Sequence, residues 1–149
     1  MIKRKITAAG LRLTPQRLAI LEFLKGNSSH PSAEDIYHGV KSRYPAISFA
    51  TIYNTLEKLK AVGGVRELTI DASRRRYDPD MTNHHHLVCR SCGRIVDIHA
   101  DYQLDLPEHA SQEFEVVATH VEFIGRCRPC GDAAAPAAPL SNTIDGGCR

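Results

Sequence analysis

The chain has 149 residues, of which 42% are hydrophobic and 24% charged, and this balance excludes an intrinsically disordered protein. Its length allows one ordinary domain or two small ones, and two lobes of about 70 residues would each benefit from a metal ion or a dimer interface. It lacks an apolar run of about 18 residues, which excludes a membrane-spanning helix. Residues 1–13 are basic without a continuous apolar core, so we expect a cytoplasmic protein whose paired cysteines bind metal rather than form disulfides.

The net charge of +2 conceals an asymmetry between the two halves. Residues 1–77 hold 14 Lys and Arg against 6 Asp and Glu, whereas residues 78–149 hold 5 against 11. Because Lys and Arg displace the counterions condensed on nucleic acid, the basic half indicates a polyanionic partner. A solvated basic face explains the charge alone equally well.

Two helices are predicted near the start of the chain. Thr14 precedes Pro15 at a first helical position, and the apolar stripe that follows ends near residue 25. Ser32 with Asp35 three residues later forms a variant of the capping box that begins a second helix. Pro45 ends this helix, because the residue before a proline avoids helical geometry.

A third helix is predicted from about residue 48 or 50 to residue 61. Ile52, Leu56 and Leu59 follow helical spacing and are expected to face the core. Polar residues on the remaining surface, with a tyrosine beside them, are the predicted DNA-contacting set: Thr51, Tyr53, Asn54, Thr55 and Lys58.

Two short strands, at residues 65–70 and 74–77, are predicted to form a hairpin after the third helix. Three helices followed by a hairpin is the order of a winged helix-turn-helix, whose last helix enters the major groove of DNA. Arg74, Arg75 and Arg76 on this hairpin suit phosphate contact. A small helical bundle with a polar surface, in which the arginines only aid solubility, is the alternative.

Residues 78–83 are predicted to be a hinge, because Asp-Pro-Asp favours a turn there. Strands are expected at residues 86–89, 94–99 and 116–124, with a short helix at 107–113. Residues 132–149 are rich in Ala, Pro, Gly and Ser and are expected to be a disordered tail, in which Cys148 is incidental.

Four cysteines form two CxxC pairs, Cys89 with Cys92 and Cys127 with Cys130. Two such pairs converge readily on one tetrahedral Zn2+, and a closed site of four thiolates has a structural role. Two independent redox dithiols are the alternative interpretation.

A second set of ligand-type side chains surrounds a run of histidines. His84 and His86 lie on one face of a strand, whereas the residue between them points to the other face. Asp78 precedes the run and Asp97 lies on the next strand, and imidazole with carboxylate suits Fe2+, Mn2+, Zn2+ or Co2+, with oxygen ligands favouring Fe2+ and Mn2+. His30 would tie the two halves together if it joined the same metal; a polar strand end is the alternative.

Several motifs together resemble the ferric uptake regulator (Fur) family over residues 6–131. They are the histidine run, the paired CxxC motifs, Thr14-Pro15-Gln16-Arg17, His30-Pro31-Ser32-Ala33 and Ala50-Thr51-Ile52-Tyr53-Asn54. The resemblance implies an α+β protein with an N-terminal winged helix-turn-helix in residues 1–77 and a metal-binding α/β dimerisation domain in residues 84–131. It also implies a homodimer that binds a palindromic operator in double-stranded DNA.

By the same resemblance, two metal sites are expected. A structural zinc would be held by Cys89, Cys92, Cys127 and Cys130, and a regulatory Fe2+ or Mn2+ by His30, Asp78, His84, His86 and Asp97. Asp97 and Asn54 are typical of the peroxide-sensing members. A metal-dependent repressor is therefore expected, not an enzyme, in which peroxide acts through the bound iron to oxidise His30 or His84.

Other functions stay open at this point. The nearest is an iron-uptake repressor that senses Fe2+ by occupancy, and a zinc-uptake repressor is less favoured because the regulatory ligands lack thiolates. A non-haem iron enzyme and a zinc-stabilised interaction module are the alternatives from other classes. A further metal site is not expected, because Asn83 stands where some relatives have a ligand, although His120 suits such a site.

Overall fold

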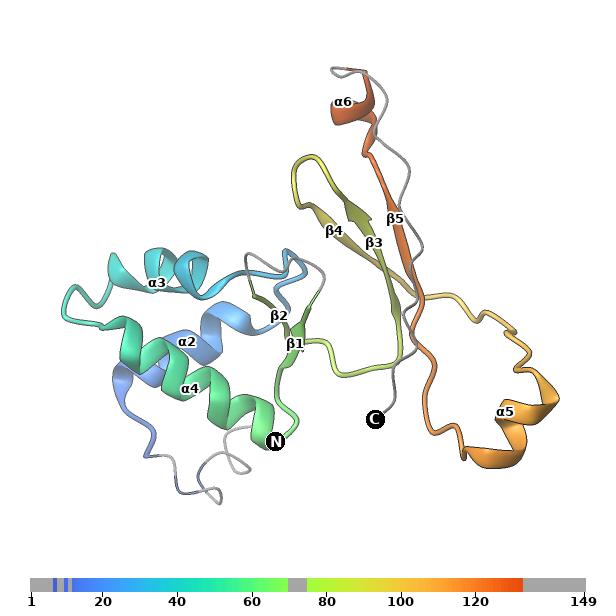
Figure 1. The fold of residues 1–149 in the computed structure, drawn as a ribbon. Coiled ribbons are helices and arrows are strands. Elements are labelled where there is room, and N and C mark those ends of the chain that lie inside the picture. The colour runs from blue at the N-terminus through green and yellow to red at the C-terminus, as the bar shows by residue number, and fades with distance from the viewer. Residues whose placement is uncertain (1–6, 8–9, 11, 70–74, 133–149) are drawn as a thin grey trace, which may run out of the picture.

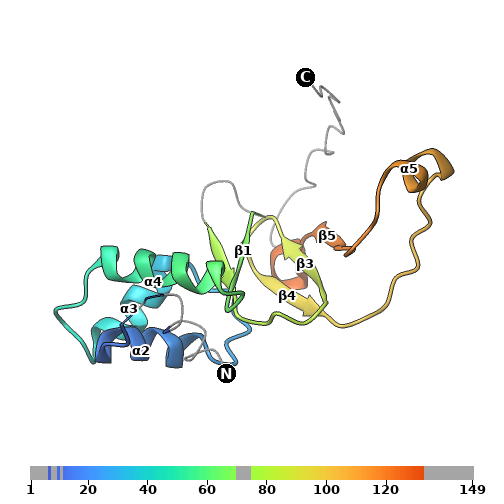
Figure 2. The ribbon, with the colours of Figure 1, turned by 90° about the horizontal axis from the view of Figure 1, so that it is seen from below.

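The structure is a computed structural model that describes residues 7, 10, 12–69 and 75–132. The helices α2, α3 and α4 cluster at one end, a hairpin adjoins them, and a three-stranded sheet follows (Figures 1 and 2). The elements in chain order are α2 (Pro15–Leu24), α3 (Ala33–Lys41), α4 (Phe49–Ala61), β1 (Arg66–Leu68), β2 (Arg76–Asp78), β3 (His85–Cys89), β4 (Ile95–Ile98), α5 (Glu108–Glu113), β5 (Glu122–Gly125) and α6 (Arg128–Gly131). Within the described residues, every helix is too short or too polar to cross a membrane.

The three N-terminal helices begin where their capping residues place them. The Thr14 side chain accepts a hydrogen bond from the Arg17 N–H at 3.4 Å. The backbone N–H of Ser32 donates to Asp35 Oδ2 at 2.9 Å while Ser32 Oγ accepts from the Asp35 N–H, which completes the predicted capping box. The predicted starts of α2 and α3 are thus confirmed, and Ser48 caps α4, so residue 48 is the correct one of its two predicted starts.

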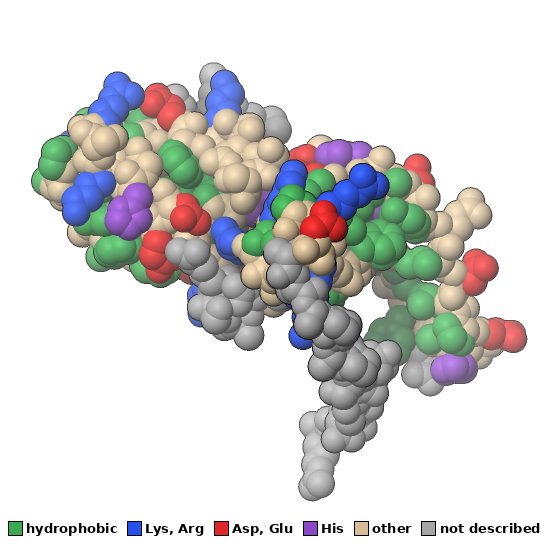
Figure 3. All heavy atoms as spheres, turned by 90° about the horizontal axis from the view of Figure 1, so that it is seen from above, with side chains coloured by type: hydrophobic (Ala, Val, Ile, Leu, Met, Phe, Trp, Pro, Cys, Tyr) green, Lys and Arg blue, Asp and Glu red, His purple; other side chains and the backbone are tan. Residues whose placement is uncertain are grey.

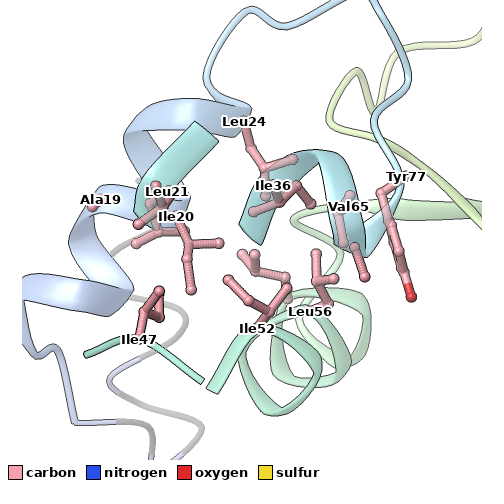
Figure 4. Close-up of a cluster of buried hydrophobic side chains, with 13 residues drawn as sticks. Ala19, Ile20, Leu21, Leu24, Ile36, Ile47, Ile52, Leu56, Val65 and Tyr77 are labelled. Carbon is pink, nitrogen blue, oxygen red and sulfur yellow. The ribbon is translucent and has the colours of Figure 1, made fainter. Parts of the chain in front are cut away.

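Apolar side chains from the three helices and β2 form one core (Figure 4). Ile20, Ile36, Ile52, Leu56 and Tyr77 are fully buried, and each such side chain contributes about 1.5–3 kcal/mol to folding. The predicted core face of α4 is confirmed, because its members are all buried: Ile52, Leu56 and Leu59. Burying this face directs the opposite side of α4 outward.

The hairpin strands are shorter than the sequence predicted. β1 pairs antiparallel with β2, and Glu67 faces Tyr77 in the centre of the ladder. Residues 70–74 lie outside the described part of the chain, so the predicted wing residue Arg74 does too. Asp78 closes β2 and is buried; a hinge at 78–83 between the two halves stays a prediction.

The C-terminal sheet has the strand order β4-β3-β5. β3 is antiparallel to β4 and parallel to β5, and this register places His86 beside both Asp97 and Glu122. The prediction of a strand at residues 116–124 is wrong in extent, because only residues 122–125 pair with β3. The segment before β5, including α5, instead leads away from the sheet (Figure 1).

Candidate metal centres

Four of the predicted regulatory ligands converge on one point between the two halves. His30 comes from the loop before α3, His84 from the residue before β3, His86 from β3 and Asp97 from β4. Their ligand atoms lie within 4.8 Å of one another, and His30 Nε2 is 2.7 Å from Asp97 Oδ1. The three imidazoles are almost fully buried, whereas Asp97 retains 15% side-chain exposure. Loop, strand end and neighbouring strand therefore supply one compact donor set.

Asp78, the fifth predicted ligand, lies against this cluster. Its Oδ2 is 3.1 Å from His84 Nε2 and 3.7 Å from His86 Nε2. Burial alone would raise the pKa of Asp78, but the neighbouring imidazoles and the Asp80 N–H, which donates to Oδ1, hold it below the usual value. Asp78 is therefore a buried, ionised carboxylate next to three imidazoles.

Several buried atoms of the cluster form no hydrogen bond of normal geometry among the described residues, although contacts such as His30 Nε2 to Asp97 Oδ1 bring them close together. They are both ring nitrogens of His30, Oδ2 of Asp78 and Oδ1 of Asp97. Leaving one such buried atom unsatisfied costs about 1–3 kcal/mol, and more for a charged group. Burial also lowers the pKa of His30, against the opposite effects of Asp97 and Asp78, which favours a neutral imidazole with a free lone pair.

Hydrogen bonds outside the cluster orient the rings of His84 and His86. The Nδ1 of His84 lies 3.0 Å from the Thr82 carbonyl, which can only accept, so Nδ1 donates to it. The Nδ1 of His120 likewise donates to the His84 carbonyl at 3.2 Å, and its Nε2 lies 3.3 Å from His86 Nδ1. Both His84 and His86 therefore direct their Nε2 atoms into the cluster.

These two nitrogens face each other at close range. The Nε2 atoms of His84 and His86 are 3.0 Å apart, and Oδ2 of Asp78 and Oδ1 of Asp97 lie beside them. A cation bound by both nitrogens would also satisfy these carboxylates. The donor set of imidazoles and carboxylates thus fits a divalent metal such as Fe2+ or Mn2+.

His30 is held in place by an unusual backbone conformation. Its φ of 50° is in the left-handed region, which disfavours residues with a Cβ. The next residue is tied to the hairpin, because the Tyr77 N–H donates to the Pro31 carbonyl at 3.0 Å. Strain of this kind persists where surrounding contacts compensate for it, and it is frequent at functional sites.

The four cysteines of the two CxxC pairs form a second cluster, within the C-terminal half. Their sulfurs lie within 4.8 Å of one another, with Cys92 and Cys127 3.7 Å apart, and all four are free thiols. Cys89 ends β3 and Cys127 caps α6. The sequence prediction that the two pairs converge is therefore confirmed.

The thiols of this cluster cannot all ionise together without a cation. Backbone N–H donors from Cys127 and Cys92 lower the pKa of Cys89 to about 6. Hydrogen bonds with the other thiols, first that of Cys127, raise the pKa of Cys130 to about 12. A bound Zn2+ stabilises four thiolates at once and leaves no open coordination position.

Most residues of the predicted DNA-contacting face of α4 lie on its outer side. Tyr53 is 40% exposed, Asn54 and Lys58 are exposed, and Thr51 is half-buried. The prediction that Thr55 points outward is wrong: its side chain is fully buried and its hydroxyl donates to the Thr51 carbonyl. Thr55 lies three residues after Ile52, which places it on the core face of the helix.

The arginines of the hairpin do not share one environment. Arg75 is exposed, and its Nε lies 3.3 Å from Oε1 of Glu67. Arg76 is not a projecting side chain as the sequence predicted: only 15% of it is exposed, and its guanidinium lies between the two halves. The sequence around Arg76 does not indicate this inward position, because it depends on the carbonyls of His30 and Gly93, which are distant in the chain.

A three-helix cluster with a wing, followed by a sheet that carries a thiol cluster and an imidazole–carboxylate cluster, defines a winged-helix metalloprotein. The family model of the ferric uptake regulator family matches residues 8–124, and the chain belongs to this family.

Curated relatives and solved structures agree with this assignment. The peroxide-responsive repressor PerR of Staphylococcus epidermidis is 44% identical over 125 residues, which cover 82% of this chain and 83% of the relative. The Helicobacter pylori ferric uptake regulator Fur has the same fold, with a TM-score of 0.70 at 23% identity over 87% of this chain and 88% of that one. A structure described as GAS PerR-Zn-Zn aligns with a TM-score of 0.50 at 29% identity, over 91% of this chain and 88% of that one.

Proposed function

We propose that this protein is a metal-dependent transcriptional repressor that senses peroxide by oxidation of a histidine ligand. The observation that carries the proposal is the pair of Nε2 atoms of His84 and His86, 3.0 Å apart beside two carboxylates. The 44% identity to a relative named as a peroxide-responsive repressor supports the same function. The protein acts as a regulator and not as a turnover enzyme.

Two metals have separate roles in this proposal. Zn2+ is structural and is bound by Cys89, Cys92, Cys127 and Cys130, the closed thiol cluster. Fe2+ or Mn2+ is regulatory and is bound by His30, Asp78, His84, His86 and Asp97. Free thiols require reducing conditions, so the proposal places the protein in the cytoplasm.

The regulatory ligands connect the part that reads DNA to the part that pairs the chains. His30 belongs to the loop before α3. His84 belongs to the segment before β3, His86 to β3 and Asp97 to β4. When these residues share one ion, the winged helix is held in one orientation relative to the sheet. The metal then favours the DNA-binding state in proportion to its preference for that state.

A surface cleft reaches the carboxylates of this site. Asp78 and Asp97 line a surface cleft of about 310 Å³ together with Gly26, Asn27 and Ser28. Bound Fe2+ supplies redox chemistry toward peroxide that Mn2+ does not. In the net reaction, a ring C–H of His30 or His84 becomes C–OH with one peroxide oxygen, and the other oxygen leaves as water. The ring loses two electrons and the peroxide gains two.

The oxidised ring is a poorer ligand, because it no longer offers the metal the Nε2 lone pair of an intact imidazole. Loss of one imidazole from the cluster weakens metal binding and releases the constraint between the halves. The protein then leaves the DNA after a single oxidation, which is the behaviour of a single-use sensor.

A homodimer provides the two-fold symmetry that a palindromic operator requires. Leu87 faces Val96 on one side and Phe123 on the other in the sheet register, and this apolar row is 36–43% exposed in the single chain. Hydrophobic side chains also lie at the surface of the C-terminal half in Figure 3. A second copy covering this face would bury the apolar row. In light scattering, the Phe123→Asp variant should therefore be a monomer, whereas the Glu122→Gln control should remain a dimer.

The test uses zinc-loaded protein and a DNA duplex that the Mn2+-loaded protein selects from a randomised pool. Binding to that duplex is measured with Fe2+ or Mn2+, before and after dilute peroxide, followed by peptide mass spectrometry. We expect only the Fe2+ form to release DNA, with one oxygen atom added to His30 or His84. If both forms keep their DNA and these histidines stay unmodified, the protein senses metal by occupancy instead.

A further inference from the structure

The side chain of Arg76 bridges the two halves beside the regulatory cluster. Its Nη1 donates to the His30 carbonyl at 3.2 Å, and its Nη2 donates to the Gly93 carbonyl at 3.3 Å. The same Nη1 lies 3.5 Å from Oδ2 of Asp35, the carboxylate of the α3 capping box. Arg76 therefore contacts a regulatory ligand, the start of α3 and the first CxxC turn at once.

We propose that Arg76 is a positioning residue that couples the zinc knuckle to the regulatory metal site. This inference rests on the proposed function, in which His30 binds the regulatory metal. Arg76 acts through the backbone of His30: it fixes the carbonyl of a residue whose side chain must reach Asp97 across the domain junction. Its second hydrogen bond anchors that residue to the turn that the zinc ligands Cys89 and Cys92 define.

The strained backbone of His30 makes such a restraint necessary. A non-glycine residue at φ 50° relaxes towards negative φ unless its neighbours prevent it. The hairpin holds the following residue through the Tyr77 N–H, and Arg76 holds the His30 carbonyl itself. Without the guanidinium, the His30 backbone is less restrained, and its ring is less firmly aimed at the cluster.

The position requires arginine for a geometric reason. A planar guanidinium presents donors in a rigid fork that can bond two separate carbonyls, whereas a lysine ammonium is a compact point donor on a flexible stem. Gly93 adopts φ 70°, and a Cβ there would lie 3.4 Å from Nη2 of Arg76. The knuckle thus combines a turn that favours glycine with a close approach of Arg76.

The first experiment measures Mn2+ affinity of the zinc-loaded protein in three variants: Arg76→Gln, Arg76→Lys and, as the matched control, Arg75→Gln. Loss of partners that orient a metal ligand typically costs about 10–100-fold in affinity, so we expect at least a tenfold weaker Kd for Arg76→Gln. Arg76→Lys should lie between this variant and the wild type. Arg75 is exposed, so Arg75→Gln should bind Mn2+ like the wild type.

The second measurement separates coupling from DNA contact. The selected duplex and one isolated half of it are titrated with each variant at saturating Mn2+ and several salt concentrations. If Arg76 positions the domains, its variants should bind the full duplex like the wild type once Mn2+ is saturating. The salt dependence of their DNA binding should also be unchanged. If Arg76 instead binds a DNA phosphate, Arg76→Gln would weaken binding to both duplexes and lower the salt slope by about one.

Unchanged Mn2+ affinity in both Arg76→Gln and Arg76→Lys, with zinc retained, overturns the inference. If Arg76→Gln loses zinc or folds poorly, Arg76→Lys decides, since it keeps the charge and most of the stem. Failure of the proposed function looks different: wild-type protein would then bind Mn2+ no more tightly than a His86→Ala variant.

Discussion

The Nε2 atom of His30 lies 2.7 Å from Oδ1 of Asp97, although one residue precedes the second helix of the winged domain and the other belongs to β4. This pair spans the junction between the part that carries the predicted DNA-reading helix and the part that carries the apolar sheet face. The thiol cluster, by contrast, is built within the C-terminal half alone. One centre can therefore hold a domain together while the other controls how two domains are oriented.

Removing a regulatory ligand should abolish high-affinity Mn2+ binding without loss of the fold. We expect His86→Ala to weaken Mn2+ binding by more than about 100-fold, because ligand loss exceeds the 10–100-fold effect of outer partners. Calorimetric titration of zinc-loaded protein measures this. His38→Ala, at an exposed position on α3, is the control, and equal effects in both variants would contradict the site.

Asp97→Glu should blunt the peroxide response while sparing Mn2+-dependent DNA binding. The aspartate side chain is one methylene shorter and is less able to bind a metal through both oxygens, which leaves room for peroxide next to the cleft that Asp97 lines. Peptide mass spectrometry after peroxide treatment of the Fe2+ form tests this. Undiminished oxidation of His30 or His84 in Asp97→Glu would refute the explanation.

Removing a zinc ligand should unfold the C-terminal half. Structural zinc binding has an apparent free energy of about 10–16 kcal/mol in zinc-finger peptides at neutral pH, so a weakened site loses much of that stabilisation. We expect Cys92→Ser to contain less than one zinc per chain and to lose its β-sheet signal in circular dichroism. Ser91→Ala, in the same turn, should retain both; a Cys92→Ser protein with a normal melting transition would show that zinc is dispensable.

His120 should act on the regulatory site through His86 and not as a ligand. Its Nε2 lies 3.3 Å from His86 Nδ1, and that hydrogen bond orients the ring of His86. His120→Ala should weaken Mn2+ binding by about 10–100-fold, and His120→Gln should restore part of it because its amide can also form a hydrogen bond. With Co2+ as a probe, the visible spectrum should shift in His120→Ala but not in His109→Ala. A lower Co2+ stoichiometry in His120→Ala would instead make His120 a ligand.

Two neighbouring positions on α4 should behave differently. Asn54 is exposed and Thr55 is buried, so Asn54→Ala should lose DNA affinity while Thr55→Val should not. Removing a base-specific hydrogen bond costs about 1–3 kcal/mol, whereas removing the Thr55 hydroxyl changes stability by about 1 kcal/mol. DNA titrations and thermal melts distinguish the two effects. Weak DNA binding by a stable Thr55→Val protein would show that Thr55 takes part in DNA binding after all.

Local patterns were sufficient for much of the fold. Thr14, Ser32 and Ser48 cap helices within their own next turn, so the starts of α2, α3 and α4 follow from three or four adjacent residues. Strand lengths did not follow, because β5 extends only as far as β3 pairs with it. A strand's ends depend on a partner, whereas a helix carries its hydrogen bonds within itself.

The sequence by itself determined which residues can bind metal, since CxxC spacing and alternate histidines on a strand are local properties: Cys89 with Cys92, and His84 with His86. Only the tertiary structure decided that Arg76 turns inward to the carbonyls of His30 and Gly93, and that His120 orients His86. Each of these roles depends on an atom far away in the chain. Such interactions are set by packing, and spacing along the sequence does not encode them.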